Sequence, residues 1–156
     1  MSKKAIQDQY PEEFSHCYGC GHLNEHGLQI KSYWDEKNKE STLKFTPRTY
    51  HTAFPGFVYG GLLASIIDCH GTATAAAAYD NENRDFGSNP PIRFVTASLK
   101  VDYKKPTPLN VELTLRGKTT EIKERKIIVD VEVYANEQLC VTGTVIAVKI
   151  PDTMIL

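Results

Sequence analysis

Apolar and polar positions alternate near the start of the chain in the manner of two neighbouring strands. Residues 28–34 alternate, residues 35–40 supply a charged turn, and residues 41–46 alternate again. Successive side chains of a strand point to opposite faces of a sheet, so this pattern predicts an antiparallel hairpin with one covered face.

A glycine pair then separates the hairpin from the least charged stretch of the chain. Residues 47–59 contain prolines and glycine, which predicts a loop ending at Gly60 and Gly61. Residues 61–79 lack proline, are rich in Ala and Leu, and carry Asp68 as their one charged residue. This composition predicts a long helix that is covered on most sides.

Strand patterns return after a polar, turn-forming segment at residues 80–92, which predicts a long loop. The predicted strands cover residues 96–103, 111–115, 127–135 and 139–150. The first two show the alternation that is typical of half-buried strands. Asn136 and Glu137 are expected to form a hairpin turn between the last two.

The order of elements predicts an α+β fold, in which an antiparallel sheet of about five to six strands wraps around one long central helix. The chain has 156 residues, a length typical of one domain. We therefore expect a single domain over residues 1–156, with residues 1–15 as a poorly ordered or peripheral N-terminal segment.

Composition narrows the range of partners. A formal net charge of -1 gives no broad electrostatic field for nucleic acid. No stretch approaches the ~20 apolar residues that span a bilayer, and residues 1–14 lack the apolar middle of a secretory signal. Four cysteines are too few for a secreted disulfide framework. These features predict a cytoplasmic protein that binds neither nucleic acid nor membrane.

The glycine pair and the helical carboxylate together suggest chemistry at a carbonyl group. Free backbone N–H groups at a helix N-terminus stabilise a developing oxyanion, and glycine lets a substrate approach closely, which makes Gly60 the candidate donor. Asp68 lies eight residues later, roughly 12 Å along the same helix. One helix therefore cannot apply both groups to one carbonyl.

Cooperation between these groups requires a second, antiparallel copy of the helix across a two-fold axis, which predicts a homodimer with two equivalent sites. Asp68 would act as a general base on water or as a nucleophile, and the residues leave both roles open. A structural role, in which Asp68 bonds a neighbouring backbone group, is the alternative; the cost of a carboxylate in so apolar a helix favours function. His70, next to it, is interpreted as a hydrogen-bonded core histidine.

Three segments resemble the phenylacetate-pathway (PaaI-like) branch of the hotdog-fold thioesterases across residues 16–149. They are C-Y-G-C-G-H-L-N-E-H-G-L at residues 17–28, Y-G-G at residues 59–61 with Asp68, and V-D-Y-K-K-P at residues 101–106. The resemblance implies a hotdog fold, an acyl-CoA substrate, a homodimer or a dimer of dimers (a homotetramer), and no cofactor.

The resemblance also implies roles for individual residues. It makes Gly60 the oxyanion donor and Asp68 the catalytic carboxylate, and it places Thr96 where relatives hold the attacking water. The substrate-binding residues that we expect are Tyr59, Gly61, His51, Asn24 and Lys104. Lys104 is chosen from the cations that flank the strand at residues 96–103, which could meet the phosphates of CoA as point charges; an ordinary solvated face is the alternative. Tyr59 departs from the family, which usually has His before the glycine pair, and His51 is a candidate to compensate.

Three other interpretations compete with the thioesterase: a metal site, a non-catalytic sensor, and a dehydratase or hydratase. Cys17 and Cys20 have a metal-like spacing, but a second pair of ligands at finger-like spacing is missing, and Cys69 and Cys140 belong to other predicted elements, so no metal is expected. A non-catalytic acyl-CoA sensor stays open because of Tyr59. A hotdog dehydratase or hydratase is disfavoured, since that chemistry requires the His that Tyr59 replaces.

Overall fold

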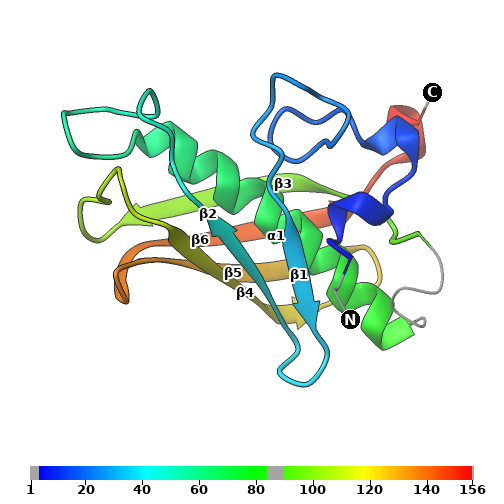
Figure 1. Ribbon diagram of the computed structural model, residues 1–156. Coiled ribbons are helices and arrows are strands. Elements are labelled where there is room, and N and C mark those ends of the chain that lie inside the picture. Colours follow the sequence, from blue (N-terminus) through cyan, green and yellow to red (C-terminus); the bar gives the residue numbers. More distant parts are fainter. Residues whose placement is uncertain (1–3, 84–89, 156) are drawn as a thin grey trace.

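A curved antiparallel sheet covers one long helix in the computed structural model, which describes residues 4–83 and 90–155 (Figure 1). In chain order the elements are β1 (Ser32–Asp35), β2 (Glu40–Phe45), α1 (Gly60–Asn83), β3 (Phe94–Tyr103), β4 (Leu113–Ile122), β5 (Lys126–Ala135) and β6 (Gln138–Lys149), with short 3-10 helices at Gln7–Gln9, Glu12–Phe14 and Asp152–Met154. The strand order is β1-β2-β4-β5-β6-β3, and every neighbouring pair is antiparallel. The predicted α+β hotdog architecture is confirmed.

Helix α1 lies across the sheet and contacts all six strands. Its middle turns are fully buried, with Ala75, Ala76 and Ala77 each 0% exposed, which explains the near absence of charge in this stretch. Gly71 permits the close approach to β6, because a Cβ there would lie 2.5 Å from a methyl group of Val145. No described helix combines the length and apolar character that crossing a bilayer requires.

The loop predicted at residues 80–92 was partly wrong. Helix α1 continues to Asn83, and residues 84–89 lie outside the described part of the chain. The Nζ atom of Lys149 on β6 donates a 2.6 Å hydrogen bond to the hydroxyl of Tyr79. Contacts of this kind hold the last turns of the helix against the sheet, so tertiary packing overrides the turn-forming composition.

Strand β3 is much more exposed than its sequence predicted. Residues 96–103 are exposed or only half-buried, with Leu99 at 38% and Tyr103 at 54% exposure. The cause is position, because among the described strands β3 is an edge strand that pairs with β6 alone. Within the described residues Val101 still packs against the core, but Leu99 and Tyr103 stay exposed, which corrects the expectation of a half-buried strand.

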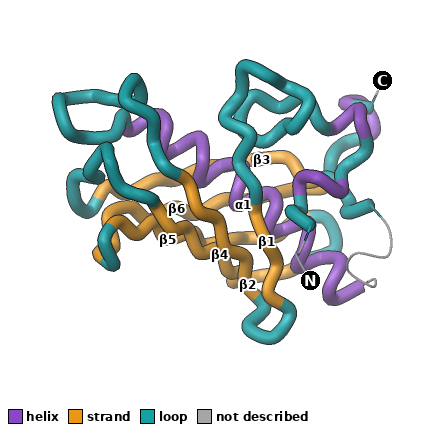
Figure 2. The backbone as a smooth tube through the Cα atoms, viewed as in Figure 1, coloured by secondary structure: helices purple, strands orange, loops and turns teal. Residues whose placement is uncertain are grey.

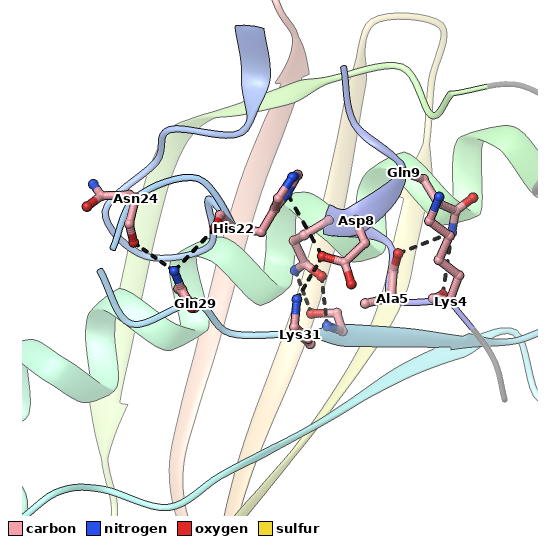
Figure 3. Close-up of polar contacts among 10 residues, drawn as sticks. Lys4, Ala5, Asp8, Gln9, His22, Asn24, Gln29 and Lys31 are labelled. Atoms are coloured by element: carbon pink, nitrogen blue, oxygen red, sulfur yellow. Dashed lines mark hydrogen bonds and ion pairs between the residues drawn. The ribbon is translucent and has the colours of Figure 1, made fainter. Parts of the chain in front are cut away.

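The N-terminal segment is part of the core rather than peripheral over its described residues. Ile6 is 0% exposed, and its N–H donates to the carbonyl of Ser32 at 2.8 Å. Lys31 Nζ reaches the carboxylate of Asp8 at 2.7 Å, and His22 lies on the other side of that carboxylate at 3.9 Å (Figure 3). The apolar and polar contacts together fasten the segment to the start of β1.

Strand β1 is shorter than predicted. The N–H groups of Leu28 and Ile30 bond to the carbonyls of Tyr18 and Gly19 in the N-terminal loop, at 2.8 and 3.2 Å. Residues 28–31 therefore alternate in sequence without pairing in the sheet, and the strand begins at Ser32.

A buried polar network surrounds His70, which is fully buried on α1. The hydroxyl of Ser32 lies 2.7 Å from Nδ1, and the hydroxyl of Ser41 lies 3.0 Å from Nε2. Gln7 donates in turn to the Ser32 hydroxyl at 2.9 Å. Burial lowers the pKa of His70 to about 4, so the ring is neutral at pH 7. The interpretation as a hydrogen-bonded core histidine is confirmed.

Two loops meet at the N-terminal end of α1 (Figure 2). Val58 donates to the carbonyl of Thr107 at 2.9 Å, and Leu109 donates to the carbonyl of Gly56 at 2.9 Å. The loop before α1 is thus bound to the loop between β3 and β4. These bonds fix the position at which the helix begins.

Candidate active site

Helix α1 begins at Gly60, with Tyr59 as its N-terminal cap. The Tyr59 carbonyl accepts the N–H groups of Leu62 and Leu63 at 3.1 and 3.4 Å. The first N–H groups of a helix have no acceptor within it and lie at the positive end of the helix dipole. The Gly60 N–H is one of these, which suits it to hold the oxygen of a polarised carbonyl.

Tyr59 and His51 lie beside this helix start. The Tyr59 ring covers Gly61 so closely that a Cβ on Gly61 would lie 2.5 Å from it, which accounts for glycine at that position. The Tyr59 N–H donates to the His51 carbonyl at 2.9 Å, and His51 Nδ1 accepts the N–H of Arg48 at 2.9 Å. Burial and the Arg48 charge lower the pKa of His51. The structure thus brings together three of the predicted substrate-binding residues.

Tyr103, at the end of β3, joins the same group and was not predicted as a site residue. Its hydroxyl donates to the Gly60 carbonyl at 2.7 Å. Partial burial raises the pKa of Tyr103, with a smaller contribution from the nearby Tyr59 phenol. The sequence placed Tyr103 on a strand face but gave no sign that this face meets the helix start.

Asp68 and Thr96 form a direct pair between α1 and β3. The Thr96 hydroxyl donates to the Asp68 carboxylate in a short hydrogen bond. Asp68 is half-buried, whereas Thr96 is exposed on the outer part of the edge strand. The register of β3 shifts between Thr96 and Ser98, and such bulges redirect side chains. The carboxylate is therefore held in place yet open to solvent.

The two halves of the predicted chemistry do not meet within one chain. Gly60 opens α1, and Asp68 follows eight residues later on the same straight element, roughly 12 Å away. The remaining predicted residues lie in other places. Asn24 uses its side chain within its own loop, donating to His16 at 3.2 Å and accepting from His26 at 3.1 Å.

A shallow hollow of about 510 Å³ lies near the helix start. Lys104, which follows β3, lines it and is exposed. The apolar part of its wall includes Phe54, Phe57 and Tyr103. A cation beside aromatic side chains suits a ligand that carries both phosphate and apolar groups.

Cysteine placement differs from the expectation that Cys69 stands apart from the N-terminal pair. The sulfur atoms of Cys17, Cys20 and Cys69 lie within 4.8 Å of one another. Cys140 lies elsewhere, with its thiol directed to the Gln138 carbonyl at 3.5 Å. Sequence spacing could not reveal this cluster, because the fold alone brings residues 17–20 to α1.

Comparison with known proteins places this geometry in a family. The model of the Thioesterase superfamily matches residues 55–142, which include the glycine pair, all of α1, and Thr96. The chain belongs to the thioesterase superfamily. A thioesterase superfamily protein from Shewanella loihica PV-4 is 44% identical, with a TM-score of 0.69, and the match covers 89% of this chain and 97% of that one.

A solved structure of low sequence identity shares the fold, and curated relatives match in sequence. The E. coli PaaI protein of the phenylacetic acid degradation operon is 15% identical, with a TM-score of 0.63, and the match covers 80% of this chain and 81% of that one. Acyl-coenzyme A thioesterase THEM4 of Rattus norvegicus is 27% identical over 129 residues, which are 81% of this chain and 50% of that protein. The Xenopus laevis THEM4 protein is 27% identical over 71% of this chain and 45% of its own length. The chain spans about half the length of these curated relatives.

Proposed function

We propose that this protein hydrolyses acyl-CoA thioesters to the free acid and CoA, in sites that two copies of the chain form together. The observation that carries the proposal is the Asp68 carboxylate, held by the Thr96 hydroxyl on an open edge of a thioesterase-superfamily fold. The relatives named acyl-coenzyme A thioesterase support the choice of acyl-CoA as substrate.

The exposed edge strand β3 supports the proposal that a second copy of the chain completes each site. Within the part of the chain that the structure describes, no strand pairs with the outer edge of β3, and a long unprotected edge favours pairing with another chain. Leu99 and Tyr103 add exposed apolar surface to it. Antiparallel pairing of two β3 strands across a two-fold axis would extend the sheet and set the two α1 helices antiparallel. Asp68 of one chain would then face Gly60 of the other, with a dimer of dimers as the larger assembly.

The chemistry follows from these positions. The Gly60 N–H would polarise the thioester carbonyl and hold the oxyanion of the tetrahedral intermediate. Asp68 would remove a proton from water as the water oxygen attacks the carbonyl carbon; the C–S bond then breaks and the CoA sulfur takes up the proton. The same carboxylate could instead attack the thioester carbonyl directly. The C–S bond then breaks, CoA leaves as the thiolate and takes up a proton, and water hydrolyses the anhydride formed on Asp68. Thr96 would hold the carboxylate, and through it the attacking water.

Substrate contacts are assigned to the residues around the helix start. Tyr59, Gly61 and His51 would border the thioester, and Lys104 would meet a phosphate of CoA as a point charge. Asn24 would shape the N-terminal loop beside the pocket. None of the four cysteines forms a disulfide, which accords with the proposed cytoplasmic location, where reducing conditions prevent disulfides.

A non-catalytic acyl-CoA binding protein is the second candidate, and one observation favours it. The Tyr59 ring lies directly over Gly61, at the helix start where the thioester would have to approach. If that ring stays in place when ligand binds, acyl-CoA could be held without hydrolysis.

Thiol release separates the two candidates. The full chain would be given short, medium, long and aromatic acyl-CoAs, and free CoA would be followed with a thiol reagent, in parallel with equilibrium binding of each compound. Hydrolysis predicts turnover of at least one member well above the rate without protein. Binding of acyl-CoA without any release of CoA would support the binding protein and contradict the enzyme.

A further inference from the structure

The three clustered cysteines connect the N-terminal loop to the catalytic helix. Cys17 and Cys20 come from the loop, whereas Cys69 lies on α1 directly after Asp68. Cys20 and Cys69 are buried, and Cys17 is half-buried. Gly19 allows the close approach, because a Cβ there would lie 2.5 Å from the Cys69 sulfur. The backbone of the loop thus packs directly against the Cys69 sulfur of α1.

The loop has the shape of a tight turn between Cys17 and Gly21. The Gly21 N–H donates to the Cys17 carbonyl at 2.8 Å. A side chain at Gly21 would collide with the turn, since a Cβ there would lie 2.4 Å from the Cys17 nitrogen. These contacts fix the conformation of the turn that carries Cys17 and Cys20.

The spacing of the sulfur atoms suits a tetrahedral ion. A Zn–S bond of about 2.3 Å places tetrahedral sulfur ligands about 3.8 Å apart. The Cys17 and Cys69 sulfurs are already 3.8 Å apart, and all three lie within 4.8 Å of one another. Side-chain rotations that shift the sulfur atoms by about 1 Å or less would bring all three to the separation of tetrahedral ligands.

The charge around the cluster distinguishes among soft metal ions. The guanidinium of Arg93 interacts electrostatically with Cys17, Cys20 and Cys69, and it lies 5.0 Å from the centre of the buried Tyr10 ring. Three thiolates around Zn²⁺ carry a net charge of -1, whereas three thiolates around Cu⁺ carry -2. Zinc therefore leaves less buried negative charge beside Arg93, so the site favours zinc.

We propose that Cys17, Cys20 and Cys69 form a three-thiolate Zn²⁺ site that fastens the N-terminal loop to α1. Among the described residues, no fourth His, Cys, Asp or Glu joins the cluster, so a water molecule completes the coordination on the side of the half-buried Cys17. The site holds the loop in position next to Asp68, and it needs neither the dimer nor thioester hydrolysis to exist.

Metal content of the purified full chain, together with its Co²⁺ spectrum, tests the site. The wild type would be expressed with added zinc and dialysed against metal-free buffer. Elemental mass spectrometry is then expected to find about one zinc per chain. Exchange for Co²⁺ is expected to give intense thiolate-to-metal absorption and the visible bands of tetrahedral cobalt. The variants C17S and C69S should lose at least about nine-tenths of the bound metal, because two thiolates hold zinc weakly.

Cys140→Ser is the matched control, since Cys140 is also buried but lies outside the cluster. It should retain the metal and the cobalt bands of the wild type. Wild-type protein without zinc and without thiolate-to-cobalt absorption would overturn the proposal, even if the cluster variants fail to fold. A disulfide between any two of the three cysteines in protein purified without oxidant, seen as a mass lower by about 2 Da, would also overturn it, because a disulfide removes two of the ligands.

Discussion

Replacing Asp68 with asparagine is expected to lower kcat for acyl-CoA hydrolysis at least ~100-fold, as for the loss of a general base. Asparagine keeps the shape of the side chain and its hydrogen bond from Thr96, but it cannot take a proton from water or attack the thioester. KM should change little, because Asp68 acts on the attacking water rather than on the bound CoA. Steady-state thiol release on the best substrate measures both constants.

Asp130 provides a matched control for this substitution. It lies on β5 and accepts a hydrogen bond from the Thr144 hydroxyl at 3.0 Å, as Asp68 does from Thr96. Asp130→Asn should therefore retain wild-type kcat. Equal activity of Asp68→Asn and the wild type, with both folded and in the same oligomeric state, would remove Asp68 from the mechanism.

Acidification is expected to destabilise the protein through His70. Burial lowers the pKa of this histidine from 6.5 to about 4 in the folded state. Below pH 6.5 this histidine becomes protonated in the unfolded chain but stays neutral in the folded chain. The free energy of unfolding therefore falls as pH falls. The loss should reach about 2 kcal/mol at pH 5 and about 3 kcal/mol near pH 4, and below that it should level off.

Urea unfolding of the wild type and of His70→Gln at pH 7 and pH 5 measures this loss. Glutamine can bond to Ser32 or Ser41 but does not titrate, so the variant should be less stable at pH 7 yet lose about 2 kcal/mol less between the two pH values. Both proteins should be compared at one concentration, because a dimer gains stability with concentration. Parallel losses in the two proteins would assign the acid sensitivity to other groups.

Much of the fold could be predicted from the sequence, because local pattern and burial agree over most of it. The uncharged stretch before Tyr79 predicted the buried helix, and Asn136 and Glu137, both with positive φ, form the predicted hairpin turn. The exposure of β3 could not be predicted, since alternation does not reveal whether a neighbouring strand is present. The end of α1 was missed for a similar reason, because Lys149 stabilises it from the far end of the chain.

The candidate site was predictable only in part. Gly60 and Asp68 could be chosen from the sequence alone. A glycine pair before an uncharged stretch indicates a helix start with free N–H groups, and a lone carboxylate in that stretch is too unfavourable to bury without a function. Thr96 came from a family resemblance, and the structure places its hydroxyl on Asp68. Tyr103 and the position of Cys69 depend on contacts between distant segments, and no local pattern carries that information.

A hybrid dimer tests the central claim, that each site takes Gly60 from one chain and Asp68 from the other. Gly60→Pro removes the Gly60 N–H, and proline fits the first turn of a helix, although its Cβ would lie 3.3 Å from the Tyr103 hydroxyl. Once the variant is shown to be folded and dimeric, its kcat should be lower ~100-fold or more by loss of the oxyanion donor. Asp68→Asn removes the catalytic carboxylate. The two variants would be co-expressed with different affinity tags, purified through both, and assayed for thiol release.

The shared site predicts that the hybrid recovers about half of the wild-type activity, because one of its two sites combines an intact Gly60 with an intact Asp68. Each parent dimer should stay nearly inactive. A hybrid as inactive as its parents would contradict the account, since both groups would then have to act within one chain.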